Sequence, residues 1–205
     1  ALVRGYKAIG VTDHVGFGNL EYVVKTLVAD CANGTKRWDI LAMPGVEITH
    51  VPKDDIDVVA RMAKELGAKL VAVHGETIVE PVEPGTNEAA VRSAFVDVLA
   101  HPGLISYEVA RLAAENGVYL EVSARKGHSL ANGHVVNTAR EAGALTVLDS
   151  DAHEPEDLLT LDLVEKIAEG AGLNKEEARA LLQINPQNLL AKLGFGPVPA
   201  SDTRP

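Results

Sequence analysis

The sequence predicts an α/β protein whose parallel sheet curls into a TIM-like barrel. Six short apolar runs alternate with amphipathic helical segments, at a pace of one strand and one helix in roughly 30 residues. The runs are apolar almost throughout, which is typical of parallel strands that are covered on both faces. Strand–helix alternation of this kind indicates a parallel sheet, either closed into a barrel or open and doubly wound.

The six predicted strands are rich in valine, isoleucine, leucine and alanine. We expect them near residues 8–12, 40–46, 69–73, 96–100, 118–123 and 145–149. Glycines mark the ends of the helices between them, because glycine takes the left-handed conformation that closes a helix. These predicted ends are Gly34, Gly67, Gly117 and Gly143.

Beyond residue 153 the chain becomes helical, beginning at Pro155, which is placed to start a helix. No linker or low-complexity segment divides the chain, so we expect a single domain over residues 1–193. The Pro-rich, polar residues 194–205 are predicted to form a flexible tail.

Composition narrows the function. The net charge of −10 and the pI near 5.1 argue against a general nucleic-acid binder, which needs clustered lysine and arginine. The single cysteine, Cys31, excludes an intramolecular disulfide and a CxxC zinc site. No apolar run approaches the length of a membrane span and no signal peptide is present, so a cytoplasmic location is expected.

Histidines and acids recur at the carboxyl ends of the predicted strands. They are His14, Glu47, His74, His101, Asp151 and His153. The first four are separated by 33, 27 and 27 residues, and Asp151 follows two βα units after His101. Carboxyl ends meet at one rim of a barrel, whereas an open sheet gathers ligands at a single switch point. Donors from nearly every strand therefore favour the barrel.

These six donors exceed the ligand set of a single ion. Mixed nitrogen and oxygen ligands suit zinc, manganese or iron, and two or more ions are the usual apparatus of phosphoester hydrolysis. Each histidine by itself also fits a core or capping role, so the prediction depends on their recurrence. Asp13 and Asp149 are expected to support ligands or to lie at strand edges rather than to bind an ion, and His50 is expected to lie in a solvated turn.

One further loop carries positive charge. Arg125, Lys126 and His128 follow the strand at 118–123, in a loop that contains glycine. At the rim of an acidic protein, these residues are candidates for binding a substrate phosphate. A solvated loop without a function is the alternative.

The sequence resembles the PHP superfamily, named for polymerase and histidinol phosphatase. The resemblance rests on "TDH", "GVE", "VHG", "AHP" and "SDAH", in this order across residues 5–193, and on "NPQNLL" near the end. It implies a distorted (β/α)7 barrel and a trinuclear metal centre that hydrolyses phosphomonoesters such as histidinol phosphate, and we expect two or three divalent ions in the complete protein. Glu47 then matches the carboxylate that bridges two ions.

The sequence departs from this pattern at its start. The family opens with an H-x-H motif about one βα unit before His14, and only thirteen residues precede His14 here. We therefore expect the first βα unit to be missing from this chain. The leading prediction is a metal-dependent phosphoesterase for a small-molecule phosphoester, in which His153 or a neighbouring ligand group protonates the leaving alcohol. The alternative is a non-catalytic PHP-like interaction module that has lost the H-x-H motif.

Overall fold

The structure is a computed structural model and describes residues 1–199. Seven strands form one sheet in which every pairing is parallel. They are β1 Ala8–Val11, β2 His14–Val15, β3 Leu41–Ile48, β4 Leu70–His74, β5 Val98–Ala100, β6 Tyr119–Ser123 and β7 Thr146–Asp149. Because β1 and β2 both pair with β3, they form one interrupted edge strand. All six predicted strands are confirmed.

Helices join the strands and continue after the last of them. Those between strands are α1 Leu20–Arg37, α2 Ile56–Leu66, α3 Thr86–Arg92, α4 Tyr107–Asn116 and α5 Asn132–Ala142. Those after β7 are α6 Leu161–Gly170, α7 Lys175–Arg179 and α8 Asn185–Lys192, with the π-helical turn η5 Ala180–Ile184 before α8. Short 3-10 turns are η1 Leu2–Arg4, η2 Lys53–Asp55, η3 His128–Ala131 and η4 Pro155–Asp157.

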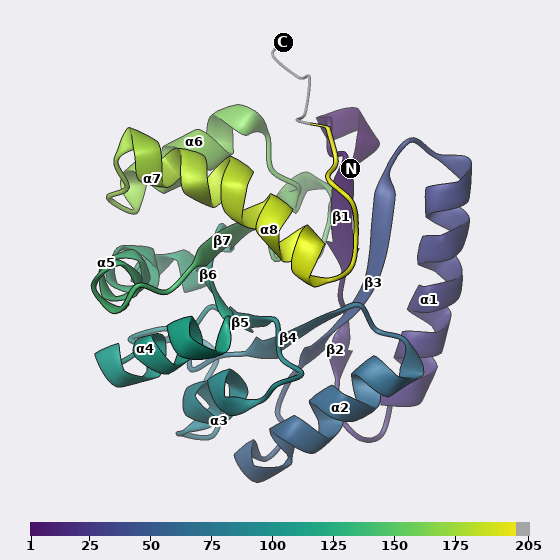
Figure 1. The fold of residues 1–205 in the computed structure, drawn as a ribbon, viewed down its shortest axis with the longest axis horizontal. Coiled ribbons are helices and arrows are strands. Elements are labelled where there is room, and N and C mark those ends of the chain that lie inside the picture. The colour runs from purple at the N-terminus through teal and green to yellow at the C-terminus, as the bar shows by residue number, and fades with distance from the viewer. Residues whose placement is uncertain (200–205) are drawn as a thin grey trace.

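The sheet curls, with its helices outside. The strand order is β1-β3-β4-β5-β6-β7, and α1 to α5 lie along the convex side while α8 crosses the centre of the view (Figure 1). Within residues 1–199 no hydrogen-bonded pairing joins β7 to β1. The predicted barrel is therefore confirmed only as a curled parallel sheet, a half-barrel whose ring is not closed.

Apolar packing fills both faces of the sheet. The larger cluster lies between the strands and the outer helices, with fully buried Val46, Val71 and Leu99 facing side chains such as Val59. A smaller cluster joins Leu189 of α8 to the strands. Since α8 fills the concave side, the polar residues gather at the carboxyl ends of the strands.

Helix ends follow the glycines in three of the four predicted cases. Gly67, Gly117 and Gly143 have φ values of 113°, 66° and 72° and close α2, α4 and α5. Gly34 does not end a helix, because α1 continues to Arg37. A Cβ at Gly34 would meet the Trp38 ring at 3.7 Å, an ordinary van der Waals contact, so neither the space nor the backbone at this position requires glycine.

The segment after α8 is held in place as far as the structure describes it. Val198 and Gln187 exchange two hydrogen bonds, of 2.9 and 3.2 Å. The rest of the predicted flexible tail, residues 200–205, lies outside the described residues. None of the helices in residues 1–199 combines the length and the apolar character that crossing a bilayer requires.

Candidate metal centre

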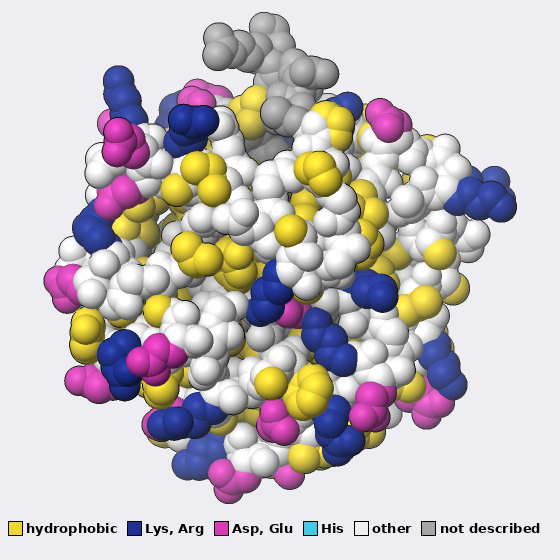
Figure 2. Space-filling view, viewed as in Figure 1, with side chains coloured by type: hydrophobic (Ala, Val, Ile, Leu, Met, Phe, Trp, Pro, Cys, Tyr) yellow, Lys and Arg dark blue, Asp and Glu magenta, His cyan; other side chains and the backbone are white. Residues whose placement is uncertain are grey.

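The strand-end histidines lie at the opposite end of the sheet from the face that Figure 2 shows. That face carries lysines, arginines and acids but, among the described residues, no histidine. Parallel register produces this grouping. His14 is the partner of Glu47 across β2 and β3, and His74 is the partner of Ala100, one residue before His101.

Glu47 is the centre of the cluster and is only 7% exposed. Its Oε1 lies 3.0 Å from His74 Nδ1 and 3.4 Å from His101 Nε2. The two nitrogens are themselves 3.0 Å apart. We call these three atoms, Glu47 Oε1, His74 Nδ1 and His101 Nε2, the Glu47 triangle. Three donor atoms on three strands therefore face one another at nearly equal distances.

The second oxygen of Glu47 faces a different histidine. Oε2 lies 3.5 Å from His14 Nε2, and the half-exposed His14 ring lies 6.0 Å from that of His153. His153 is held by its Nδ1, 3.1 Å from the Asp151 carbonyl oxygen. The two oxygens of Glu47 thus point to two separate groups of imidazoles, one buried and one at the open rim.

Asp151 lies on the far side of His101. Its Oδ2 is 3.9 Å from His101 Nδ1 and 3.7 Å from His128 Nε2. Arg125 Nε lies 3.6 Å from the same oxygen, while Lys126 is exposed. The sequence grouped His128 with these two cations, but the structure buries it, 3% exposed, inside the histidine cluster.

Two buried polar atoms beside the Glu47 triangle have no hydrogen bond among the described residues. They are His101 Nδ1 and Glu121 Oε1. His101 Nδ1 lies 3.0 Å from Glu121 Oε2, but the atoms are not aligned for a hydrogen bond, and that oxygen accepts the backbone N–H of His101. An unmade bond at a buried polar group costs about 1–3 kcal/mol. The atoms that gather around them are imidazole nitrogens and carboxylate oxygens, which are ligand types of zinc and manganese, so the residues present fit a divalent metal ion.

Charges within the cluster compensate one another. Burial acts to raise the pKa of Glu47, but hydrogen bonds from the His101, His14 and His74 imidazoles outweigh it and lower the pKa. Burial acts to lower the pKa of His101, but Glu121 and Glu47 raise it to about 10. Burial, helped by the charge of His101, lowers the pKa of His128 to about 4. In the ion-free protein His101 therefore carries the neutralising proton, and His128 is neutral.

The backbone is strained at the same rim. Among residues 1–199, the non-glycine residues with positive φ are His50, His101 and Asp151, at 54°, 26° and 45°. Such conformations cost of order 1–3 kcal/mol each and persist where surrounding structure imposes them. The exposed His50 ring lies 6.0 Å from that of His74, so its turn borders the cluster.

Sequence reasoning missed three residues of the cluster. Glu121 lies in β6, and its signal was an acid inside the apolar run "VYLEVSA". Thr77 Oγ1 lies 2.7 Å from His128 Nδ1, and Glu80 Oε2 lies 3.8 Å from His128 Nε2. Thr77 and Glu80 come from the loop after β4, and no strand pattern could have located them.

Comparison with solved structures supports the fold alone. No family model matches the chain. The crystal structure of an uncharacterized protein superposes with a TM-score of 0.57 and 12% sequence identity. The match covers 98% of this chain and 67% of the other.

Several curated proteins are similar in sequence. A protein of Shewanella halifaxensis named "probable phosphatase" is 33% identical over 154 residues, which are 68% of this chain. The chain spans only 60% of the length of that protein. A "probable phosphatase" of Caldanaerobacter subterraneus is 25% identical over 202 residues, 86% of this chain and 76% of that protein.

Another similarity covers most of both chains. It is to the Methanocaldococcus jannaschii protein named "Uncharacterized protein MJ1295", which is 44% identical over 195 residues. The aligned residues make up 94% of this chain and 89% of that protein. The chain therefore belongs to the family of MJ1295.

Proposed function

We propose that this chain hydrolyses a small-molecule phosphomonoester with the help of divalent metal ions. The Glu47 triangle is the observation that carries the proposal. Ligand bonds of about 2.0–2.2 Å to a tetrahedral ion place ligand atoms about 3.3–3.6 Å apart. The edges of the triangle are 3.0, 3.4 and 3.0 Å. Both short edges end at His74 Nδ1, so a small outward movement of the His74 ring would lengthen both to this spacing. The name "probable phosphatase" of the relatives supports the same reaction.

Six residues would hold the ions in this proposal. They are His14, Glu47, His74, His101, Asp151 and His153. Glu47 would bridge two ions, because its two oxygens face different histidines. Two or three ions of zinc, manganese or iron suit this mixture of nitrogen and oxygen donors. Bound there, such ions polarise a phosphoryl oxygen and lower the pKa of a bound water.

Other side chains would orient the substrate and move a proton. Arg125, with its guanidinium at the rim, and the exposed Lys126 would bind the phosphate oxygens of the substrate. His153 is half-exposed, and its Nδ1 is engaged with the Asp151 carbonyl oxygen. Its Nε2 is therefore the nitrogen left to bind an ion, and only a protonated His153 without an ion at Nε2, or a neighbouring ligand group, would donate the proton to the leaving alcohol.

The curled sheet is, in this proposal, part of a distorted (β/α)7 barrel of the PHP type. The six strand positions, which are paired in parallel and curl with α1 to α5 on the convex side, support this architecture. Histidinol phosphate is one candidate substrate among small phosphomonoesters.

The test is a phosphatase screen on protein whose metal content is measured in parallel. We expect turnover of at least one small phosphomonoester, its loss on chelation and its return on adding Mn²⁺ or Zn²⁺. Lys25→Ala on the outer surface of α1 is the control for handling, since among residues 1–199 Lys25 pairs only with the exposed Glu21. Metal-loaded protein without turnover on any phosphoester would overturn the hydrolase and favour an interaction module.

A further inference from the structure

Loop 75–85, which joins β4 to α3, is tied down at both ends. Glu76 Oε1 accepts the backbone N–H groups of Gly85 and Asn87, at 3.0 and 2.9 Å. Asn87 Oδ1 accepts the N–H of Glu76 at 2.9 Å. Because its two ends are bonded to each other, the middle of the loop is held over the histidine rim.

The middle of the loop carries two polar side chains to His128. Thr77 Oγ1 lies 2.7 Å from His128 Nδ1, and the His128 side chain is 1% exposed. An imidazole that binds a metal almost always donates its other N–H to an oxygen. When His128 Nδ1–H donates to Thr77 Oγ1, Nε2 carries the lone pair. This nitrogen faces Glu80 Oε2 at 3.8 Å and Asp151 Oδ2 at 3.7 Å. Both distances exceed a hydrogen bond.

Stacking separates His128 from the Glu47 triangle. The His128 and His101 ring centroids lie 4.1 Å apart and the ring planes differ by 13°. An imidazole lone pair lies in the plane of its ring, so a ring stacked on His101 does not direct its Nε2 at the ion that His101 Nε2 would bind in the triangle. The rings of His74 and His101 cross at 74° and do converge. An ion within reach of His128 Nε2 must therefore occupy another position.

We propose that His128 Nε2, Asp151 and Glu80 form a further divalent-cation site, distinct from the Glu47 triangle. Glu80 makes loop 75–85 part of this site, because its carboxylate is the donor that the loop supplies. The site would add an ion to the proposed hydrolase. Its binding of a cation does not depend on the proposed function, but a role of that ion in hydrolysis does.

The charge and the donor types favour a metal ion over an anion. Two carboxylates lie within 4 Å of one imidazole nitrogen and repel a phosphate. One nitrogen and two carboxylate donors suit zinc or manganese. The separations of 3.7 and 3.8 Å exceed the spacing of ligand atoms around a tetrahedral ion by a few tenths of an ångström. Rotation of the half-exposed Glu80 side chain closes the difference for Glu80, and the 3.7 Å separation from Asp151 needs the smaller adjustment.

The experiment measures metal binding to the chelator-treated protein. Calorimetric titration with Mn²⁺ or Zn²⁺ alone gives the affinity, and elemental analysis after dialysis gives the number of bound ions. The variants are Glu80→Gln and His128→Gln. Glu83→Gln is the matched control, because Glu83 lies in the same loop but contacts Lys53 away from the rim. Glu80 is half-exposed, so its variant stays folded even if His128→Gln does not, and circular dichroism checks both.

We expect the wild type and Glu83→Gln to bind the same number of ions. Glu80→Gln should weaken one class of site at least about tenfold, and His128→Gln should abolish that class while a second class persists. Wild-type binding in Glu80→Gln would overturn the site, and so would loss of every ion in either variant. Wild-type protein that binds these ions but hydrolyses nothing would instead overturn the proposed function and leave this site in place.

Discussion

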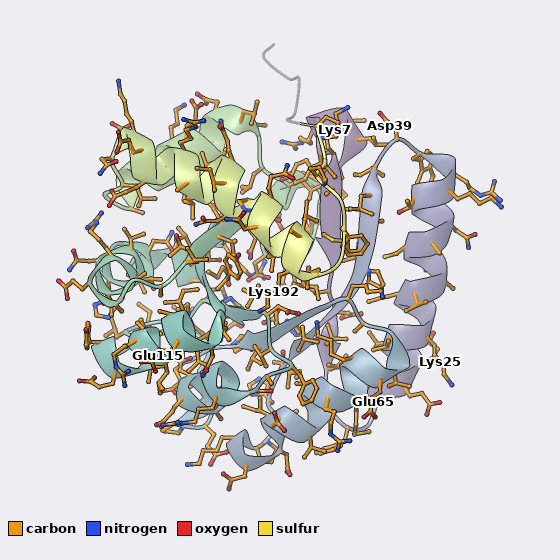
Figure 3. The ribbon with its side chains drawn as sticks, viewed as in Figure 1. Lys7, Lys25, Asp39, Glu65, Glu115 and Lys192 are labelled. Carbon is orange, nitrogen blue, oxygen red and sulfur yellow. The ribbon has the colours of Figure 1, made fainter. Side chains whose placement is uncertain are left out.

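Two buried carboxylates lie at opposite ends of the same sheet and are neutralised in different ways. Glu47 is 7% exposed at the carboxyl ends of the strands, and Asp97 is 5% exposed just before β5, at the amino ends. Asp97 accepts a hydrogen bond from Lys64 Nζ at 2.5 Å and from the Val71 N–H at 2.9 Å. Lys192 Nζ, labelled at the end of α8 in Figure 3, lies 3.5 Å from its other oxygen.

The difference separates structure from chemistry. The partners of Asp97 are a backbone N–H and two lysines from α2 and α8, so the carboxylate joins these helices to the sheet and both of its oxygens have partners. The partners of Glu47 are imidazoles, which exchange a proton for a metal ion, and unbonded buried atoms lie beside them. A buried carboxylate therefore indicates a functional site when its present partners can give way to a metal ion, as imidazoles can.

The largest effect should follow from Glu47→Gln. Glutamine has the same shape but no charge, and its amide nitrogen cannot bind a cation. Turnover should fall by about three orders of magnitude or more, because the cluster acts as a unit. Metal analysis and a phosphatase assay measure this, with circular dichroism as the check on folding. Full metal content in Glu47→Gln would show that the two carboxylates do not differ as argued.

His74→Ala should come next. It removes one corner of the Glu47 triangle and should weaken metal binding at least about 100-fold, because a ligand contributes no less than the residues behind the ligands, whose loss costs up to about 100-fold. His50→Ala is its control, because His50 is exposed and lies 6.0 Å from the His74 ring. Calorimetric titration measures the affinity of both variants for the metal. An equal loss of affinity would show that His74 is no more important for metal binding than the neighbouring His50.

Asp97→Ala should affect stability and leave metal binding unchanged. Removing one partner of a fully buried pair costs about 3–5 kcal/mol. We expect about 2 kcal/mol in the free energy of unfolding, because Lys64 and Lys192 keep side-chain exposures of 26% and 36% and can turn to water. Urea denaturation and elemental analysis test both parts. A fall in metal content would show that Asp97, at the amino ends of the strands, influences metal binding at their carboxyl ends.

Arg61→Ala should have the smallest effect. Arg61 pairs with Glu65, four residues later on the outer face of α2, where Figure 3 labels Glu65. Both side chains are about half-exposed, and such pairs contribute at most about 0.5 kcal/mol. A larger loss of unfolding free energy, measured by urea denaturation, would mean that exposed ion pairs stabilise this protein as much as the buried pair at Asp97 does.

The sequence predicted what depends on local patterns. Continuous apolar runs located the strands, and the residue at the end of each run gave Glu47, His74 and His101, because parallel register places strand ends together. Closure of the ring was not confirmed, since it depends on a pairing between edges far apart in sequence.

Other features depend on tertiary contacts, and sequence patterns did not contain them. Loop 75–85 reaches the rim through bonds from Glu76, and His128 is buried because it stacks on His101. The prediction that Gly34 ends a helix was wrong, because the Trp38 N–H bonds to the Gly34 carbonyl oxygen and the helix continues to Arg37.

The strained backbone at His101 and Asp151 has a consequence for protein engineering. Glycine adopts positive φ without the steric cost that aspartate and histidine bear, so Asp151→Gly relaxes the backbone while deleting a carboxylate from a crowded acidic cluster. A library screened only for heat resistance should therefore accumulate substitutions at this rim, in line with the trade-off between stability and activity. The most heat-resistant variants should include proteins that no longer retain metal, unless metal retention is selected in the same round.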